Sequence, residues 1–223
     1  MKGFRKRILA KRTMIDIAQI IQLQTDTVAQ WHQGPIENNA TDLLGTVCTQ
    51  HSFNYQLWHE EDIARSPDVS DQEIARVKRS IDRFNQQRND WIEKLDDQIA
   101  DLLTSNSVSP SEDAQLNTET PGSAIDRLSI MSLRLYHLRE QLDRDDVDQQ
   151  HRESVGQKIN VCLLQQSELA KSLQQLIEDL FAGRKRHLTY RQFKMYNDPT
   201  LNPYLYQSAQ EAGEQSTQRK VSA

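Results

Sequence analysis

The sequence contains few of the residues that interrupt helices and few that build sheets. It has 7 Gly and 6 Pro among 223 residues, and it lacks the alternating runs of β-branched residues from which strands are made. These absences exclude a β-rich fold. Hydrophobic residues make up 36% of the chain and charged residues 26%, which suits long amphipathic helices that each bury one stripe. We therefore expect an all-α, elongated bundle.

Cysteine is also scarce, and no apolar run is long enough to cross a bilayer. Cys48 and Cys162 are the only cysteines, whereas secreted disulfide domains carry more, and neither lies at the spacing of a zinc site. The first twelve residues hold six Lys or Arg but no apolar stretch typical of a signal peptide. The sequence therefore predicts a cytoplasmic protein with no transmembrane segment.

Charge is distributed unevenly along the chain. The net charge is −5 although both the first twelve residues and residues 183–194 are basic, so the body between them is acidic. Basic ends suit a phosphorylated ligand, an RNA backbone or an anionic membrane surface, but they also occur as solvated termini. Because the body is acidic, we do not expect nucleic acid to be the partner.

Five segments carry apolar residues at the alternating three- and four-residue steps of a bundle helix. Ser70 and Glu73 form a capping box, Thr120 precedes a proline that suits a first helical turn, and Gly183 suits a left-handed helix end. These signals predict antiparallel helices at about residues 14–31, 37–65, 70–102, 120–142 and 155–180.

The segments outside these helices differ in composition. We predict a basic arm at residues 1–12, a single helical domain at 13–206 and a disordered tail at 207–223. Residues 104–118 are rich in Ser, Asn, Asp and Thr and are predicted to form a mobile loop. The segment 190–206 is aromatic, and we expect it to pack back on the bundle.

Several polar residues interrupt the apolar stripes, at Gln24, His51, Asn54, Arg88 and Gln166. A buried amide without a partner costs about 1–3 kcal/mol, so each of these groups must be paired. In antiparallel hairpins, residues 24, 48–51, 85–89 and 136–137 would lie at similar heights. This predicts a polar layer across the bundle, which either sets the helix register or belongs to a functional site.

A second polar set follows helical spacing on the predicted second, third and fourth helices. It is enriched in His, Asp, Asn and Arg rather than in the Lys, Glu and Gln typical of solvent faces. We expect catalysis by His59, Asp62 and His137, with ligand binding by Arg65, Asp82, Asn85, Arg88, Asn89, Asp126, Arg127 and Tyr136.

The chemistry of this set stays open between two forms. In one, a metal is ligated from among His59, Asp62, Asp82, Asp126 and His137, although the paired Glu-x-x-His signature of di-iron bundles is absent. In the other, arginines clamp an anion in a metal-free pocket and a histidine acts as acid or base. The sequence identifies no cofactor, and it has no P-loop, dinucleotide-binding or nucleophile-elbow motif.

Three blocks of sequence, in order, resemble the bacterial family called domain of unknown function 4254, over about residues 54–206. They are LWHEEDIARSPDVSDQEIARVKRSIDRFNQQRND, ETPGSAIDRLSIMSLRLYH and YRQFKMYNDPTLNP. The resemblance implies an association with cell-envelope polysaccharide synthesis. Through the last block it adds Lys194, Tyr196 and Asn197 to the ligand-binding residues.

Together these features predict an enzyme or binding protein with a polar pocket between the second, third and fourth helices. We expect its ligand to be an anionic small molecule such as a nucleotide-sugar or phosphosugar, and we leave open whether the protein catalyses a reaction. The alternative is a noncatalytic adaptor that docks a partner protein, a second copy of itself or a membrane surface.

Overall fold

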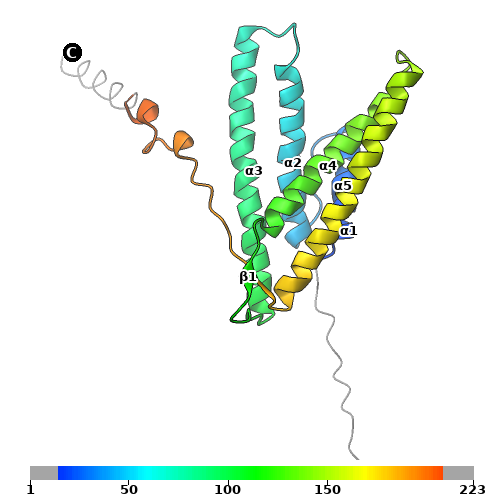
Figure 1. Cartoon of the computed structure of the whole chain (residues 1–223). Helices are drawn as coiled ribbons and strands as arrows, with labels where there is room; N and C mark the ends of the chain where they lie inside the picture. Colours follow the sequence, from blue (N-terminus) through cyan, green and yellow to red (C-terminus); the bar gives the residue numbers. More distant parts are fainter. Residues whose placement is uncertain (1–14, 208–223) are drawn as a thin grey trace, which may run out of the picture. The chain divides into compact units, whose positions relative to one another are not determined.

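The structure, a computed structural model, describes residues 15–207 and confirms the all-α bundle (Figure 1). The predicted basic arm and the predicted disordered tail beyond residue 207 lie outside the described residues. Five long helices are present: α1 (Ile17–Trp31), α2 (Asp42–Ala64), α3 (Asp71–Ser105), α4 (Pro121–Leu142) and α5 (Gln149–Phe181). Of the described residues, those from 15 to 190 belong to one compact unit and those from 191 to 207 belong to a second.

Three of the predicted helix boundaries follow from local capping and are confirmed. The Ser70 hydroxyl accepts a hydrogen bond from the Glu73 N–H at 3.3 Å, and the Thr120 hydroxyl accepts one from the Ser123 N–H at 3.1 Å. Each bond satisfies one of the N–H groups left open at a helix start. Gly183, just beyond α5, has φ +72°, a conformation that glycine adopts without steric strain.

The start of α2 corrects the prediction, because the helix begins at Asp42 and not near residue 37. The residues before it are held outside the helix by side chains. The Trp31 indole donates to the Glu37 carbonyl at 3.1 Å, and the Asn38 amide donates to the Gly45 carbonyl at 2.7 Å. Residues 33–41 therefore form a connection with its own hydrogen bonds.

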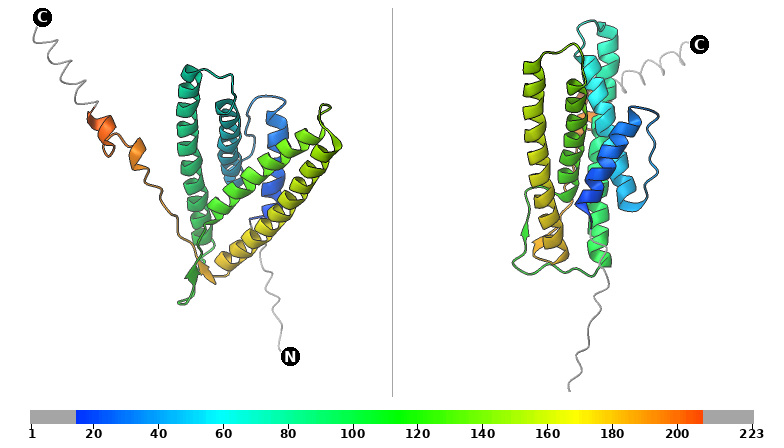
Figure 2. Two further views of the ribbon diagram at one scale, coloured as in Figure 1. Left: turned by 45° about the horizontal axis from the view of Figure 1, so that its top comes forward. Right: turned by 90° about the vertical axis from the view of Figure 1, so that its right-hand side faces the viewer.

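The helices are arranged as two pairs with α1 beside them. Helix α2 packs along α3, α4 packs along α5, and α1 contacts α4 and α2 (Figure 2). One apolar core joins all five helices through Ile20, Val47, Leu95, Ile125 and Ile177, which are fully buried. Burial of such a side chain contributes roughly 1.5–3 kcal/mol, so this core holds the two pairs together.

Two short strands connect the loop after α3 to the end of α5. Strand β1 (Gln115–Leu116) pairs in parallel with β2 (Lys185–Arg186), and the Lys185 ammonium donates to the Asn117 side-chain oxygen at 2.7 Å. Part of the predicted mobile loop is thus hydrogen-bonded, and its mobility stays a prediction. Among residues 15–207, no helix combines the length and apolarity that crossing a membrane requires.

Candidate functional site

A buried carboxylate, Asp126 on α4, organises the polar residues of the bundle. One of its oxygens accepts from the Gln50 amide at 2.6 Å, the Asn54 amide at 2.9 Å and Arg88 Nε at 2.7 Å. The other accepts from Arg88 Nη2 at 2.5 Å. The charge-assisted hydrogen bond to Asp126 raises the pKa of Arg88 above its ordinary value. Three helices are therefore connected through one anion.

His51 on α2 extends this network toward α1. Its Nε2 lies 3.0 Å from the Gln24 carbonyl and its Nδ1 lies 2.6 Å from the Ser129 hydroxyl. Because a carbonyl can only accept, Nε2 carries the proton, and in the neutral ring Nδ1 accepts from Ser129. Burial lowers the pKa of His51 to about 3, so the ring is neutral at physiological pH.

The predicted polar layer is therefore present for Gln24, His51 and Arg88, and Asp126 is its centre. Asn54, which was predicted only to interrupt an apolar stripe, also belongs to it. The prediction was wrong in placing residues 136 and 137 in the same layer. They lie about three turns beyond Asp126 on α4, where they contact His32 and His59 instead. The misplaced helix is α4, because Arg88 on α3 meets Asp126 rather than residues 136–137, whereas Gln24 and His51 meet as predicted.

A cleft of about 370 Å³ opens between α2, α3 and α4 beside this network. Its polar lining comes from Asn54, Glu61, Asp62, Arg65, Asn85 and Arg88, and its apolar lining from Leu57, Trp58, Ile130 and Leu133. Of the three guanidinium nitrogens of Arg88, two donate to Asp126, and Nη1 makes no hydrogen bond within residues 15–207. The cleft thus brings together Asp62, Arg65, Asn85 and Arg88 from the predicted set.

Other predicted residues lie away from this cleft. Asp82 pairs with Lys78 at 2.5 Å on α3. Arg127 pairs with Glu119 at 2.8 Å and lines a separate cleft between α4 and α5. Asn89 is half-buried on α3 and is not part of the cleft lining.

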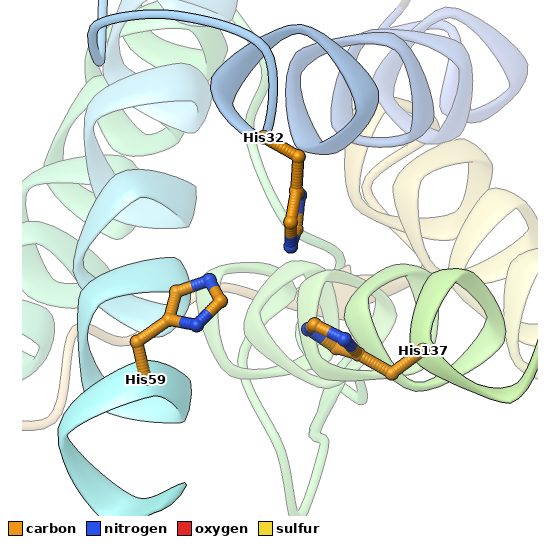
Figure 3. A group of neighbouring side chains, drawn as sticks. All are labelled: His32, His59 and His137. Carbon is orange, nitrogen blue, oxygen red and sulfur yellow. The ribbon is translucent and has the colours of Figure 1, made fainter. Parts of the chain in front are cut away.

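Three histidines from different parts of the chain meet at a second place. His59 on α2 and His137 on α4, both predicted, are joined by His32, the residue that ends α1; Figure 3 shows the three rings directed toward a common centre. One ring nitrogen from each lies within 4.8 Å of the other two. We refer to these three residues as the histidine cluster.

Aromatic side chains surround the histidine cluster. Tyr136 stacks on His32 with ring centroids 4.1 Å apart, and Trp58 stacks on His137 at 4.7 Å. Because Trp58 also lines the cleft, it is the residue common to both places. Burial lowers the pKa of His59, and His32 and His137 lower it further by charge repulsion.

His32 was not predicted from the sequence. Its signal was weak, because it ends a helix and follows a tryptophan rather than a helical repeat of polar residues. The chain has only six histidines. His32 could therefore have been found by considering each remaining histidine as a third member of a group with His59 and His137.

The remaining predicted residues, Lys194, Tyr196 and Asn197, belong to the second unit. Residues Met195–Asn197 form a single 3₁₀ turn, η1, and the Tyr196 carbonyl accepts from the Asn202 amide at 2.7 Å. Their part in ligand binding, and the packing of this segment on the bundle, stay predictions.

Comparison with known proteins confirms the family resemblance for the first two of the three sequence blocks, while the third block, which begins at Tyr190, lies beyond the match. The family described as "Protein of unknown function (DUF4254)" matches residues 44–189. This range contains the cleft residues, Asp126 and two of the three clustered histidines, while His32 and the segment after residue 189 lie outside it. No curated protein and no solved structure matches the chain.

Proposed function

This chain belongs to the DUF4254 family, and we propose that it binds an anionic small molecule, of the phosphosugar class, in the cleft between α2, α3 and α4. The observation that carries the proposal is that the cleft is lined by Asn54 and Arg88, two members of the network centred on Asp126. Polar groups fixed in this way are oriented before a ligand arrives, which lowers the entropy cost of binding.

The remaining lining suits a sugar with a charged group. Asp62 and Asn85 supply carboxylate and amide groups that can hydrogen-bond hydroxyls, and Trp58 supplies an aromatic surface. A volume of about 370 Å³ lies toward the small end of ligand pockets, roughly 300–1,000 Å³. The size favours a monosaccharide phosphate over a nucleotide-sugar.

Arg65 is the proposed anion-binding residue. Its side chain is 70% exposed, and among residues 15–207 it forms a salt bridge only with Glu61 of α2, at 2.5 Å. Exposed pairs of this kind contribute roughly 0–1 kcal/mol, so a phosphate can compete for the guanidinium. Arg88, whose charge is neutralised by Asp126, would instead offer its Nη1 hydrogens.

Any catalysis in the cleft would use Asp62 as acid or base, because Asp62 lines the cleft. His59 and His137, which we also predicted to be catalytic, are not part of the lining. Removal of the Asp62 carboxylate by Asp62→Asn, which keeps the side-chain shape, should abolish turnover of a bound phosphosugar and change its affinity little. Equal turnover by both proteins would contradict a catalytic role.

To test the proposal, the full chain is titrated separately with glucose 1-phosphate, glucose and UDP-glucose. Binding is measured by calorimetry and by tryptophan fluorescence. We expect glucose 1-phosphate to bind tightest and Arg65→Gln to weaken it roughly 10-fold or more, since a hydrogen bond to a charged group contributes about 1.5–3 kcal/mol. The matched control is Arg127→Gln, because Arg127 is also an exposed arginine paired with a glutamate.

The control should leave the affinity unchanged. Weak fragments bind with a Kd on the order of 1 mM. If none of the three compounds binds at about this concentration, the ligand is not a phosphosugar. Equal losses from Arg65→Gln and Arg127→Gln would show binding by general surface charge and would contradict the assignment of the cleft.

A noncatalytic adaptor is the second candidate, and one surface favours it. Val161 and Leu164, three residues apart on α5, are 54% and 63% exposed, and neighbouring exposed apolar side chains are typical of protein contact surfaces. We expect Leu164→Glu to abolish self-association, or pull-down of a partner, if this surface docks a protein. An unchanged molar mass and an unchanged set of captured proteins would contradict the adaptor function.

A further inference from the structure

The histidine cluster has the composition of a metal site, and we propose that His32, His59 and His137 bind one divalent transition-metal ion, with Zn²⁺ as the reference ion. The proposal depends on these three residues alone and not on the phosphosugar proposed for the cleft. Three neutral imidazoles with one further position for water or another ligand form a known type of zinc site.

Each of the three rings has one nitrogen, Nε2, without a hydrogen-bond partner among the described residues. These Nε2 atoms of His32, His59 and His137 are all buried. Each unpaired buried polar atom costs about 1–3 kcal/mol. One water molecule has only two hydrogens to donate and cannot satisfy three acceptors, whereas one cation can accept a lone pair from each ring.

Hydrogen bonds on the opposite ring nitrogen favour the tautomer in which Nε2 has a free lone pair. His32 Nδ1 lies 2.7 Å from the Val28 carbonyl and His137 Nδ1 lies 2.7 Å from a Glu140 carboxylate oxygen. Both partners can only accept, so each Nδ1 carries the proton and each neutral ring presents an unprotonated Nε2. Histidine ligands are usually supported in this way by a carbonyl or carboxylate on the other ring nitrogen.

The distances between the three nitrogens are close to those that a bound ion requires. For three atoms within 4.8 Å of one another, the most distant central point lies roughly 2.8 Å from each, whereas a Zn–N bond is about 2.0–2.1 Å. Closure around an ion thus requires each nitrogen to move by less than about 1 Å. Small side-chain rotations suffice, so the backbone can stay in place.

The surroundings also suit a cation bound by nitrogen. Glu140, which supports His137, and Asp62, whose charge acts on His59, place negative charge close to the cluster. Imidazole ligands select Zn²⁺, Co²⁺, Ni²⁺ and Cu²⁺ over the oxygen-binding Mg²⁺ and Ca²⁺. The ion would join the end of α1 to α2 and α4.

The test uses the full chain freed of metal with a chelator and then titrated with Zn²⁺ by calorimetry and with Co²⁺ by visible absorption. We expect one Zn²⁺ per chain and the intense visible bands of four-coordinate Co²⁺. Loss of a group that supports a metal ligand weakens metal binding roughly 10–100-fold. Alanine at His32, His59 or His137 should weaken Zn²⁺ binding by more than this, whereas Glu140→Gln should weaken it by an amount within this range.

The control is His151→Ala, because His151 on α5 also has a buried, unpaired Nε2 but is not part of the cluster. It should leave Zn²⁺ affinity and the Co²⁺ spectrum unchanged. Circular dichroism of each metal-free variant checks folding, and His59→Gln serves as a second variant if His59→Ala unfolds. Equal Zn²⁺ affinity of the wild type and the His59→Ala/His137→Ala double variant, or a six-coordinate Co²⁺ spectrum, would overturn the proposal.

Discussion

Replacement of Asp126 by alanine should be among the most destabilising single changes in this chain. The carboxylate accepts four hydrogen bonds from Gln50, Asn54 and Arg88, and its side chain is 6% exposed. Removal of one partner from a buried ion pair costs roughly 3–5 kcal/mol, and each amide left without its acceptor adds about 1–3 kcal/mol. These losses are not additive, because the groups share one acceptor.

Partial relief is available to Arg88, whose side chain is 26% exposed and lines the cleft. We therefore expect Asp126→Ala to lower the free energy of unfolding by about 4 kcal/mol, a large share of the roughly 5–15 kcal/mol typical of a folded protein. Urea unfolding followed by far-ultraviolet circular dichroism measures this change. Asp126→Asn, which keeps the shape and one acceptor oxygen, should lose less and serves if the alanine variant does not fold.

The matched control for this experiment is Glu119→Ala. It also removes a carboxylate that pairs with an arginine, Arg127, but both side chains are about half exposed, and such pairs contribute roughly 0–1 kcal/mol. The reasoning is refuted if Asp126→Ala and Glu119→Ala lower the free energy of unfolding by similar amounts. That result would mean that the network makes no net contribution to stability.

Three further predictions follow from burial and close packing. Burial lowers the pKa of His51 from 6.5 to about 3. The contribution of His51 to stability is therefore complete above pH 6.5 and is lost as the pH falls toward 3, by about 1.4 kcal/mol for each pH unit. The urea midpoint should depend less on pH in His51→Gln than in the wild type, and an equal pH dependence of the two midpoints would contradict this. Burial raises the pKa of the Cys48 thiol to about 11. In a Cys162→Ala variant, a thiol reagent at pH 8 should therefore label Cys48 only when the protein unfolds. Rapid labelling of the folded variant would refute the prediction. A Cβ at Gly122 would lie 2.7 Å from the Ile92 carbonyl oxygen, so Gly122→Ala should destabilise by roughly 1–3 kcal/mol, whereas Gly156→Ala, with open space around it, should be neutral or stabilising in thermal melts.

Local features of the sequence predicted the five helices and three of their boundaries, but not the starts of α2 and α5. Ser70, Thr120 and Gly183 act within a few residues of themselves, through a side-chain cap or a backbone conformation, so their roles can be predicted without a tertiary structure. The same holds for the expectation that Gln24, His51, Asn54, Arg88 and Gln166 have partners. Each has at least one, although Gln24 Oε1 is buried without a hydrogen-bond partner within residues 15–207. The expectation follows from the cost of unpaired buried groups and needs no knowledge of which groups pair.

The partners themselves were decided by the tertiary structure. Asp126 and Arg88 are 38 residues apart in sequence, and His32, His59 and His137 come from three separate segments; helix periodicity defines a face on each helix but not the height at which two faces meet. Here Gln24 and His51 meet at the predicted height, whereas Arg88 meets Asp126 about three turns before the predicted residues 136–137. The five helices and the need for polar pairing could thus be predicted from sequence, because helix periodicity is local and the cost of an unpaired buried group does not depend on its partner. Only the tertiary structure determined the cleft and the histidine cluster, because both require side chains from distant segments to meet at one place.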